Sequence, residues 1–80
     1  MYKVHEQVVL TVAVSGDDEE DLQPGDVGTI VHLHPGGQAF VAEFLALEGE
    51  TVAIATVLPS QARPVTNADL THARPLKTGV

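Results

Sequence analysis

A run of five carboxylates, Asp17, Asp18, Glu19, Glu20 and Asp21, is the densest group of chemically active side chains in this chain. Carboxylate oxygens suit hard divalent cations, but the run lacks the alternating ligands, the glycine and the final glutamate of an EF-hand loop. Charge blocks of this kind are usually solvated, self-repelling loops. A block of negative charge can also attract a basic protein, so we take these five residues as partner-binding candidates.

Two histidines, His32 and His34, place imidazoles on one face of a predicted strand. A zinc site would need a third ligand, for which His5 and His72 are the options. Histidine pairs on strands are more often surface residues beside a turn. The chain has no cysteine, which removes Cys-based zinc sites and thiolate chemistry. The sequence therefore predicts no metal site and no cofactor, with His32 and His34 as the weak candidates.

Groups that could support catalysis are few. A nucleophile needs an orienting partner, and a general base must lie within hydrogen-bond reach of its proton. Ser15 and Ser60 both fall in turn-like sequence, which explains them without chemistry. Glu43 is expected to project outward from its strand between apolar neighbours. The sequence predicts that the protein is not an enzyme.

Alternation along residues 39–47 places Phe40, Ala42 and Phe44 on one face of a strand and Val41, Glu43 and Leu45 on the other. The next strand, residues 51–58, is apolar on both faces. In so small a domain this indicates a covered outer face or a contact between subunits. Val41, Glu43 and Leu45 are therefore also partner-binding candidates, and a homo-oligomer is one way to cover them. Scattered surface apolar residues are the alternative.

These side chains are positioned by predicted strands at residues 8–14, 27–34, 39–47 and 51–58, with a short last strand at 63–65. Short turns join the strands after one long acidic loop at residues 15–26. This pattern predicts an all-β fold, a small SH3-like barrel of about five strands. Residues 1–65 are assigned to the barrel. Residues 66–80 are interpreted as a C-terminal tail for which partial disorder is left open.

The long loop ends in a structural turn formed by Pro24, Gly25 and Asp26. Proline presets the backbone for the first central position of a turn, and glycine accepts the positive φ that a type II turn needs next. Asp26 can hydrogen-bond nearby backbone. Gly28, just inside the following strand, is typical of a bulge or of a place where another segment crosses closely.

The charge distribution limits the class of partner. The 80 residues carry a net charge of −7, and residues 17–50 hold nine carboxylates and no lysine or arginine. Nucleic-acid binding needs basic side chains that neutralise phosphates, so it is disfavoured. No apolar run is long enough to span a membrane, and the N-terminal residues are too polar for a signal peptide. We expect a cytoplasmic protein with no membrane partner.

Three segments together resemble a family of short uncharacterised bacterial proteins. They are Gly25-Asp26-Val27-Gly28-Thr29-Ile30-Val31, Phe40-Val41-Ala42-Glu43-Phe44 and Gly49-Glu50-Thr51-Val52-Ala53. Val8-Val9-Leu10 and Arg63-Pro64 also match, so the resemblance covers roughly residues 4–65. The first segment alone is less specific, because it recurs in SH3-like barrels that include KOW-type modules.

This resemblance implies an SH3-like barrel without enzymatic activity. It also implies a small partner of other proteins, since some members look like the antidote half of toxin–antitoxin pairs. The chain departs from the family in its more acidic first loop and at Ala42, where a larger aliphatic side chain is expected. The second departure implies a thinner core.

Together these observations predict a non-enzymatic protein-interaction module that binds a basic partner through its acidic loop and an exposed strand edge. An accessory or regulatory subunit of an enzyme is the first alternative. A KOW-like nucleic-acid-associated module is the second, and the acidic charge argues against it.

Overall fold

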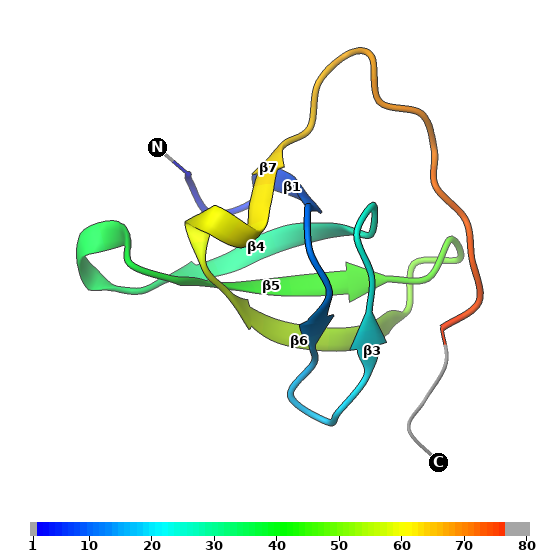
Figure 1. Ribbon diagram of the computed structural model, residues 1–80, viewed down its shortest axis with the longest axis horizontal. Helices are drawn as coiled ribbons and strands as arrows, with labels where there is room; N and C mark the ends of the chain where they lie inside the picture. Colours follow the sequence, from blue (N-terminus) through cyan, green and yellow to red (C-terminus); the bar gives the residue numbers. More distant parts are fainter. Residues whose placement is uncertain (1, 77–80) are drawn as a thin grey trace.

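The computed structural model describes residues 2–76, and its regular elements are strands and two short 3₁₀ turns (Figure 1). Five strands form an antiparallel sheet in the order β6-β5-β4-β1-β7. They are β1 (Gln7–Leu10), β4 (Val27–Leu33), β5 (Phe40–Leu45), β6 (Thr51–Val57) and β7 (Ala62–Pro64). The 3₁₀ turns are η1 (Pro35–Gly37), between β4 and β5, and η2 (Pro59–Gln61), before β7.

A second sheet consists of β2 (Val14–Ser15) and β3 (Asp21–Leu22), which pair as a hairpin within the long first loop. β2 contacts β6, so the β2–β3 hairpin packs against the part of the main sheet that β6 forms (Figure 1). The two sheets enclose one core. The prediction of an all-β, small barrel-like fold with a long acidic first loop is confirmed.

Two details of the predicted strands were wrong. The strand expected at residues 8–14 ends at Leu10, and the loop expected at residues 15–26 contains β3. After Leu10 the chain leaves the main sheet, because the Leu10 carbonyl accepts a hydrogen bond from the Gly25 amide at 2.8 Å and Thr11 donates to the Gln61 carbonyl at 2.8 Å. The exposed residues 11–13 then carry the chain to the second sheet, where Leu22 is buried.

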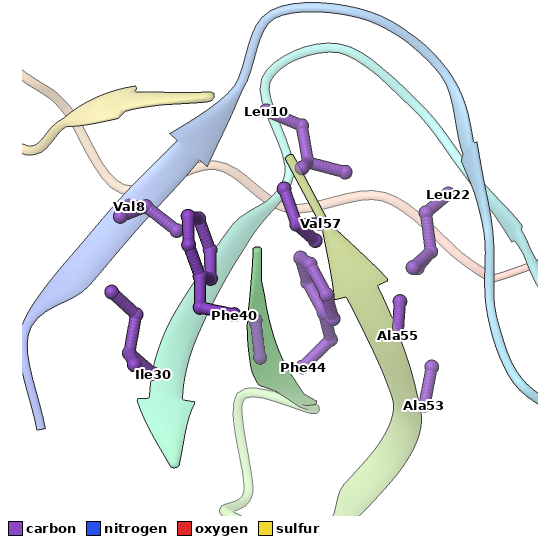
Figure 2. Close-up of a cluster of buried hydrophobic side chains, with 10 residues drawn as sticks. Val8, Leu10, Leu22, Ile30, Phe40, Phe44, Ala53, Ala55 and Val57 are labelled. Carbon is purple, nitrogen blue, oxygen red and sulfur yellow. The ribbon is translucent and has the colours of Figure 1, made fainter. Parts of the chain in front are cut away.

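The core lies between the two sheets (Figure 2). It contains Phe40 and Phe44 from β5, which flank Ala42 on the inward face of that strand. The remaining buried side chains come from β1, β3, β4 and β6 and are Val8, Leu10, Leu22, Ile30, Ala53, Ala55 and Val57. The inward and outward faces of β5 are thus the ones that its alternation predicted. In β6, which is apolar on both faces, Ala53, Ala55 and Val57 are the buried side chains.

Gly28 lies against the ring of Phe44. A Cβ atom at this position would be 2.9 Å from Phe44 Cε2 and 3.2 Å from the Ala42 Cβ. Both neighbours are buried in the core, so neither can move away freely. Glycine here permits β4 and β5 to approach at the register that pairs Gly28 with Phe44.

We expect Gly28→Ala to lower the free energy of unfolding by about 1–3 kcal/mol, because the added methyl group overpacks the core. Urea denaturation of the two proteins measures this difference. Phe44→Leu provides the control, since a smaller side chain makes room for the methyl group. The loss caused by Gly28→Ala should be smaller in the Phe44→Leu background, and an equal loss in both backgrounds would show that the ring contact is not the cause.

Candidate partner-binding site

The acidic run forms a defined hairpin turn between β2 and β3. The Gly16 amide donates to the Glu20 carbonyl at 2.9 Å, and the Glu19 amide donates to the Gly16 carbonyl at 2.9 Å. Glu20 Oε1 accepts a hydrogen bond from the Asp18 amide at 3.2 Å. Asp17, Asp18, Glu19 and Asp21 are exposed and Glu20 is half-buried. The fold therefore presents this block of charge on a structured turn.

This acidic turn is attached to the edge of the main sheet. The Asp17 amide donates to the Ile54 carbonyl at 2.7 Å. Ile54 belongs to β6, the last strand in the sheet order, and pairs with Glu43 of β5. The two groups of partner-binding candidates are thus linked, because Ile54 contacts the acidic turn on one side and Glu43 on the other.

The outer face of β5 and β6 is largely apolar. Leu45 is 46% exposed, Ile54 is 40% exposed and Val52 is 37% exposed, while Val41 and Glu43 are half-buried. Side chains of this type on an accessible sheet face favour contact with another protein. The structure places Val41, Glu43 and Leu45 on a central strand, and the neighbouring strand β6 lies at one end of the sheet order.

The predicted structural turn is also the place where the C-terminal segment attaches. Gly25 has a φ of +96°, the left-handed conformation that favours glycine. Asp26 is 8% exposed, and its Oδ2 accepts a hydrogen bond from the Gln23 amide at 2.8 Å. Arg74 Nε donates to Asp26 Oδ1 at 2.8 Å, and Arg74 Nη2 donates to Oδ2 of the same carboxylate. His72 Nε2 lies 3.1 Å from Asp26 Oδ1.

The pKa of Asp26 reflects two opposing effects. Burial raises it, whereas hydrogen bonds from Arg74 and from the Gln23 amide, together with the positive charge of Arg74, lower it. The lowering effects are the larger, so the pKa of Asp26 lies below its ordinary value. The carboxylate is therefore held ionised as the counter-ion of Arg74.

Residues 65–76 form a strap that arches from β7 past the outer face of the sheet and returns beside β3 (Figure 1). Its first part is fixed by Asp69, whose carboxylate accepts two hydrogen bonds from Arg63, at 2.7 Å and 3.0 Å. These bonds hold the pKa of Asp69 well below its usual range. A groove of about 850 Å³ separates the strap from the sheet, with Glu43 and Leu45 on one wall and Val65 and Leu70 on the other.

The two histidines considered for a metal site contact each other. The ring centroids of His32 and His34 are 5.4 Å apart in an edge-to-face arrangement. His72, one of the options for a third ligand, contacts Asp26 instead. Within residues 2–76 no group of three or more metal-binding side chains is assembled. In the same part of the chain, no helix has the length and apolar character needed to cross a membrane.

A family model described as a domain of unknown function (DUF4926) matches residues 4–64. The chain belongs to this family. The DUF4926 match ends at Pro64, which is also the last residue of β7, so it covers the five strands of the main sheet and the β2–β3 hairpin. No curated protein and no solved structure matches the chain.

The sequence did not point to Arg74 as a site residue, and it offered His72 only as a zinc ligand. Both lie beyond the DUF4926 match, yet both contact Asp26 inside it. The available signal was electrostatic: Asp26 lies in a long acidic stretch without lysine or arginine, so any cationic partner had to come from elsewhere in the chain. Nothing in the sequence distinguishes Arg74 from the other basic residues of the C-terminal third as the partner of Asp26.

Proposed function

We propose that this protein is a non-enzymatic interaction module that binds a basic protein partner, in the manner of an antidote that binds a basic toxin. The observation that supports the proposal best is the attachment of the acidic turn to the edge of β6. This arrangement places negative charge, apolar side chains and a strand edge on one surface. The partner is expected in the cytoplasm, the compartment that the sequence favours.

The strand order and the 3₁₀ turn before the last strand support the assignment of an SH3-like barrel. In this arrangement β6 has one side paired with β5 and the other at the edge of the sheet. The Ile54 carbonyl points to that edge, since it accepts from Asp17. Backbone groups alternate in direction along an antiparallel strand, so those of Thr56 point to the same edge. Because the Ile54 carbonyl is already bonded to the Asp17 amide, an extended segment of the partner would pair at the Thr56 end of this edge.

Charge complementarity sets the kind of partner. Opposite charges at the rim of an interface raise the rate of association and make it depend on salt, while apolar contacts are insensitive to salt. The acidic turn supplies the first kind of contact, and the exposed side chains of Val52 and Ile54 supply the second. A partner with a basic extended segment that also carries apolar residues would make both the charged and the apolar contacts.

We expect Asp17→Asn/Asp18→Asn to weaken binding of a basic partner about fivefold at low salt, because each exposed charge pair contributes about 0.5 kcal/mol. Glu48→Gln/Glu50→Gln is the matched control. It removes the same charge from another exposed turn of this chain. The partner is first identified by affinity capture from native lysate at low salt, and its dissociation constant is then measured at low and high salt.

The proposal holds if the variant at the acidic turn loses affinity and salt dependence while the control keeps both. Equal losses in the two variants would mean that only the net charge of the protein matters. No loss in either would place the partner on another surface. Absence of any basic partner, with the protein self-associating as a defined oligomer, would contradict the proposed function.

A further inference from the structure

The carboxylate of Asp26 forms a receptor for a guanidinium group. Arg74 donates to both of its oxygens, and Arg74 Nη2 also donates to the Asp21 carbonyl at 3.0 Å. Three acceptors therefore face one planar, forked donor. This geometry selects arginine over lysine, because the lysine ammonium is a single point of charge and cannot form the paired hydrogen bonds.

The receptor and its occupant lie in different parts of the chain. Asp21, Gly25 and Asp26 belong to the DUF4926 domain, which ends at residue 64, and His72 and Arg74 belong to the strap beyond it. Inside the domain, the Gln23 amide is the hydrogen-bond donor that the structure gives to the Asp26 carboxylate. The barrel thus holds a nearly buried carboxylate whose positive partner comes from outside the domain.

The strap is fastened near its ends. The ion pair between Arg63 and Asp69 fixes its start, and the contacts of His72, Arg74 and Leu76 fix its end. The residues between them, 70 and 71, are exposed, and the groove keeps the strap away from the outer face of β5. Release of the C-terminal end of the strap therefore requires loss of the His72 and Arg74 contacts with Asp26 and of the packing of Leu76 against the core.

We propose that residues 72–76 are an internal ligand of the guanidinium receptor formed by Asp26 and the Asp21 carbonyl, and that an arginine in an extended segment of the basic partner displaces them. The proposal rests on the proposed function and adds to it a binding site, a required residue in the partner and a means of control. Displacement would also widen the groove beneath the strap, which Glu43 and Leu45 line.

The tether determines how strongly the strap competes. A segment joined by a short flexible linker has an effective concentration in the millimolar range at its own binding site. A free peptide with the same contacts must exceed that concentration to enter the site. A partner that also contacts Asp17 and Asp18 gains affinity that the strap lacks, because within residues 2–76 the hydrogen bonds of Arg74 and His72 reach the acidic run only at the Asp21 carbonyl.

The test uses the full chain and a peptide of residues 70–76, Leu-Thr-His-Ala-Arg-Pro-Leu, capped at both ends. We expect saturable binding to the Arg74→Ala protein, with NMR shifts at the amides of Gln23, Gly25 and Asp26. Binding to the unaltered protein should be at least tenfold weaker, because its receptor is occupied. The peptide with alanine in place of arginine, and the Asp26→Asn/Arg74→Ala protein, should show no binding.

Equal binding of the peptide to the unaltered and Arg74→Ala proteins would overturn the proposal, as would undiminished binding of the alanine peptide. If Arg74→Ala fails to fold, displacement of the strap is tested by titrating the unaltered protein with the peptide. Excess peptide should then shift the Arg74 Nε–H resonance as the strap is released, and an unchanged resonance at saturating peptide would count against displacement.

A further comparison separates this inference from the proposed function. The basic partner should bind the Arg74→Ala protein at least threefold more tightly than the unaltered protein, because it no longer competes with the strap. A partner that binds both equally, but loses affinity on neutralisation of Asp17 and Asp18, would leave the proposed function standing and overturn the displacement.

Discussion

Phe40→Ala is expected to lower the free energy of unfolding by about 3–5 kcal/mol, the cost of removing a buried aromatic side chain and leaving a cavity. Phe40 is 1% exposed and is among the largest of the fully buried side chains. Its ring lies 5.1 Å from that of Tyr2, measured between centroids, and its strand position pairs with Leu33 and Val57. The substitution therefore removes contacts to three separate segments.

The loss expected for Phe40→Ala is a large fraction of the total free energy of unfolding. A domain of this size is stabilised by about 4–12 kcal/mol, at 0.05–0.15 kcal/mol per residue. The core also includes three alanines, Ala42, Ala53 and Ala55, which supply little volume to compensate. Phe40→Ala should consequently leave a substantial unfolded fraction at physiological temperature.

Urea denaturation monitored by circular dichroism measures the effect as a lower transition midpoint. Val52→Ala is the control, because Val52 lies on the outer face of β6 and is 37% exposed. It should change stability by less than about 0.5 kcal/mol. A Phe40→Ala loss no greater than that of Val52→Ala would mean that the ring is not part of the cooperative core.

The inward face of β5 illustrates what sequence pattern can predict. Strict alternation of Phe40, Ala42 and Phe44 with Val41, Glu43 and Leu45 leaves one register in which the larger apolar set is buried, and the structure adopts it. The bounds of β4, β5 and β6 were predicted to within two residues.

The first strand shows where pattern is insufficient. Residues 8–14 are apolar or β-branched, which favours one long strand, but a small barrel needs a corner after Leu10. That corner is set by hydrogen bonds to Gly25 and Gln61, both distant in sequence. Local propensity contains no information about such partners, so β2 and β3 were not distinguished from loop.

The candidate site, like the fold, could be predicted only in part from the sequence. The acidic turn is visible as a run of charge, but its attachment to Ile54 depends on how the hairpin folds over the sheet. The contact between Asp26 and Arg74 joins residues 48 positions apart. Asp26 had a sufficient local explanation, the hydrogen bond to Gln23 within its own turn, and so nothing in the sequence required a distant partner.

Loss of the contact between Asp26 and Arg74 is expected to lower the free energy of unfolding by about 1.5–3 kcal/mol, the range for hydrogen bonds to charged groups. Asp26→Asn keeps the shape of the side chain and its acceptor for the Gln23 amide, and Arg74→Gln keeps part of the strap's length and polarity. The double variant should lose less than the sum of the two single variants, with a coupling of about 0.5–3 kcal/mol. Additive losses would mean that the two side chains act independently.

The same contact predicts how stability depends on pH. The pKa of Asp26 is lower in the folded protein than its ordinary value of 3.8, so the folded state binds fewer protons than the unfolded state. The stabilisation is therefore complete above the unfolded-state pKa and is lost as the pH falls through the folded-state pKa. Between pH 5 and pH 2, the unaltered protein should lose stability more steeply than Asp26→Asn. Equal slopes would show that Asp26 is not the titrating group, because the Asn variant keeps the remaining carboxylates, including Asp69.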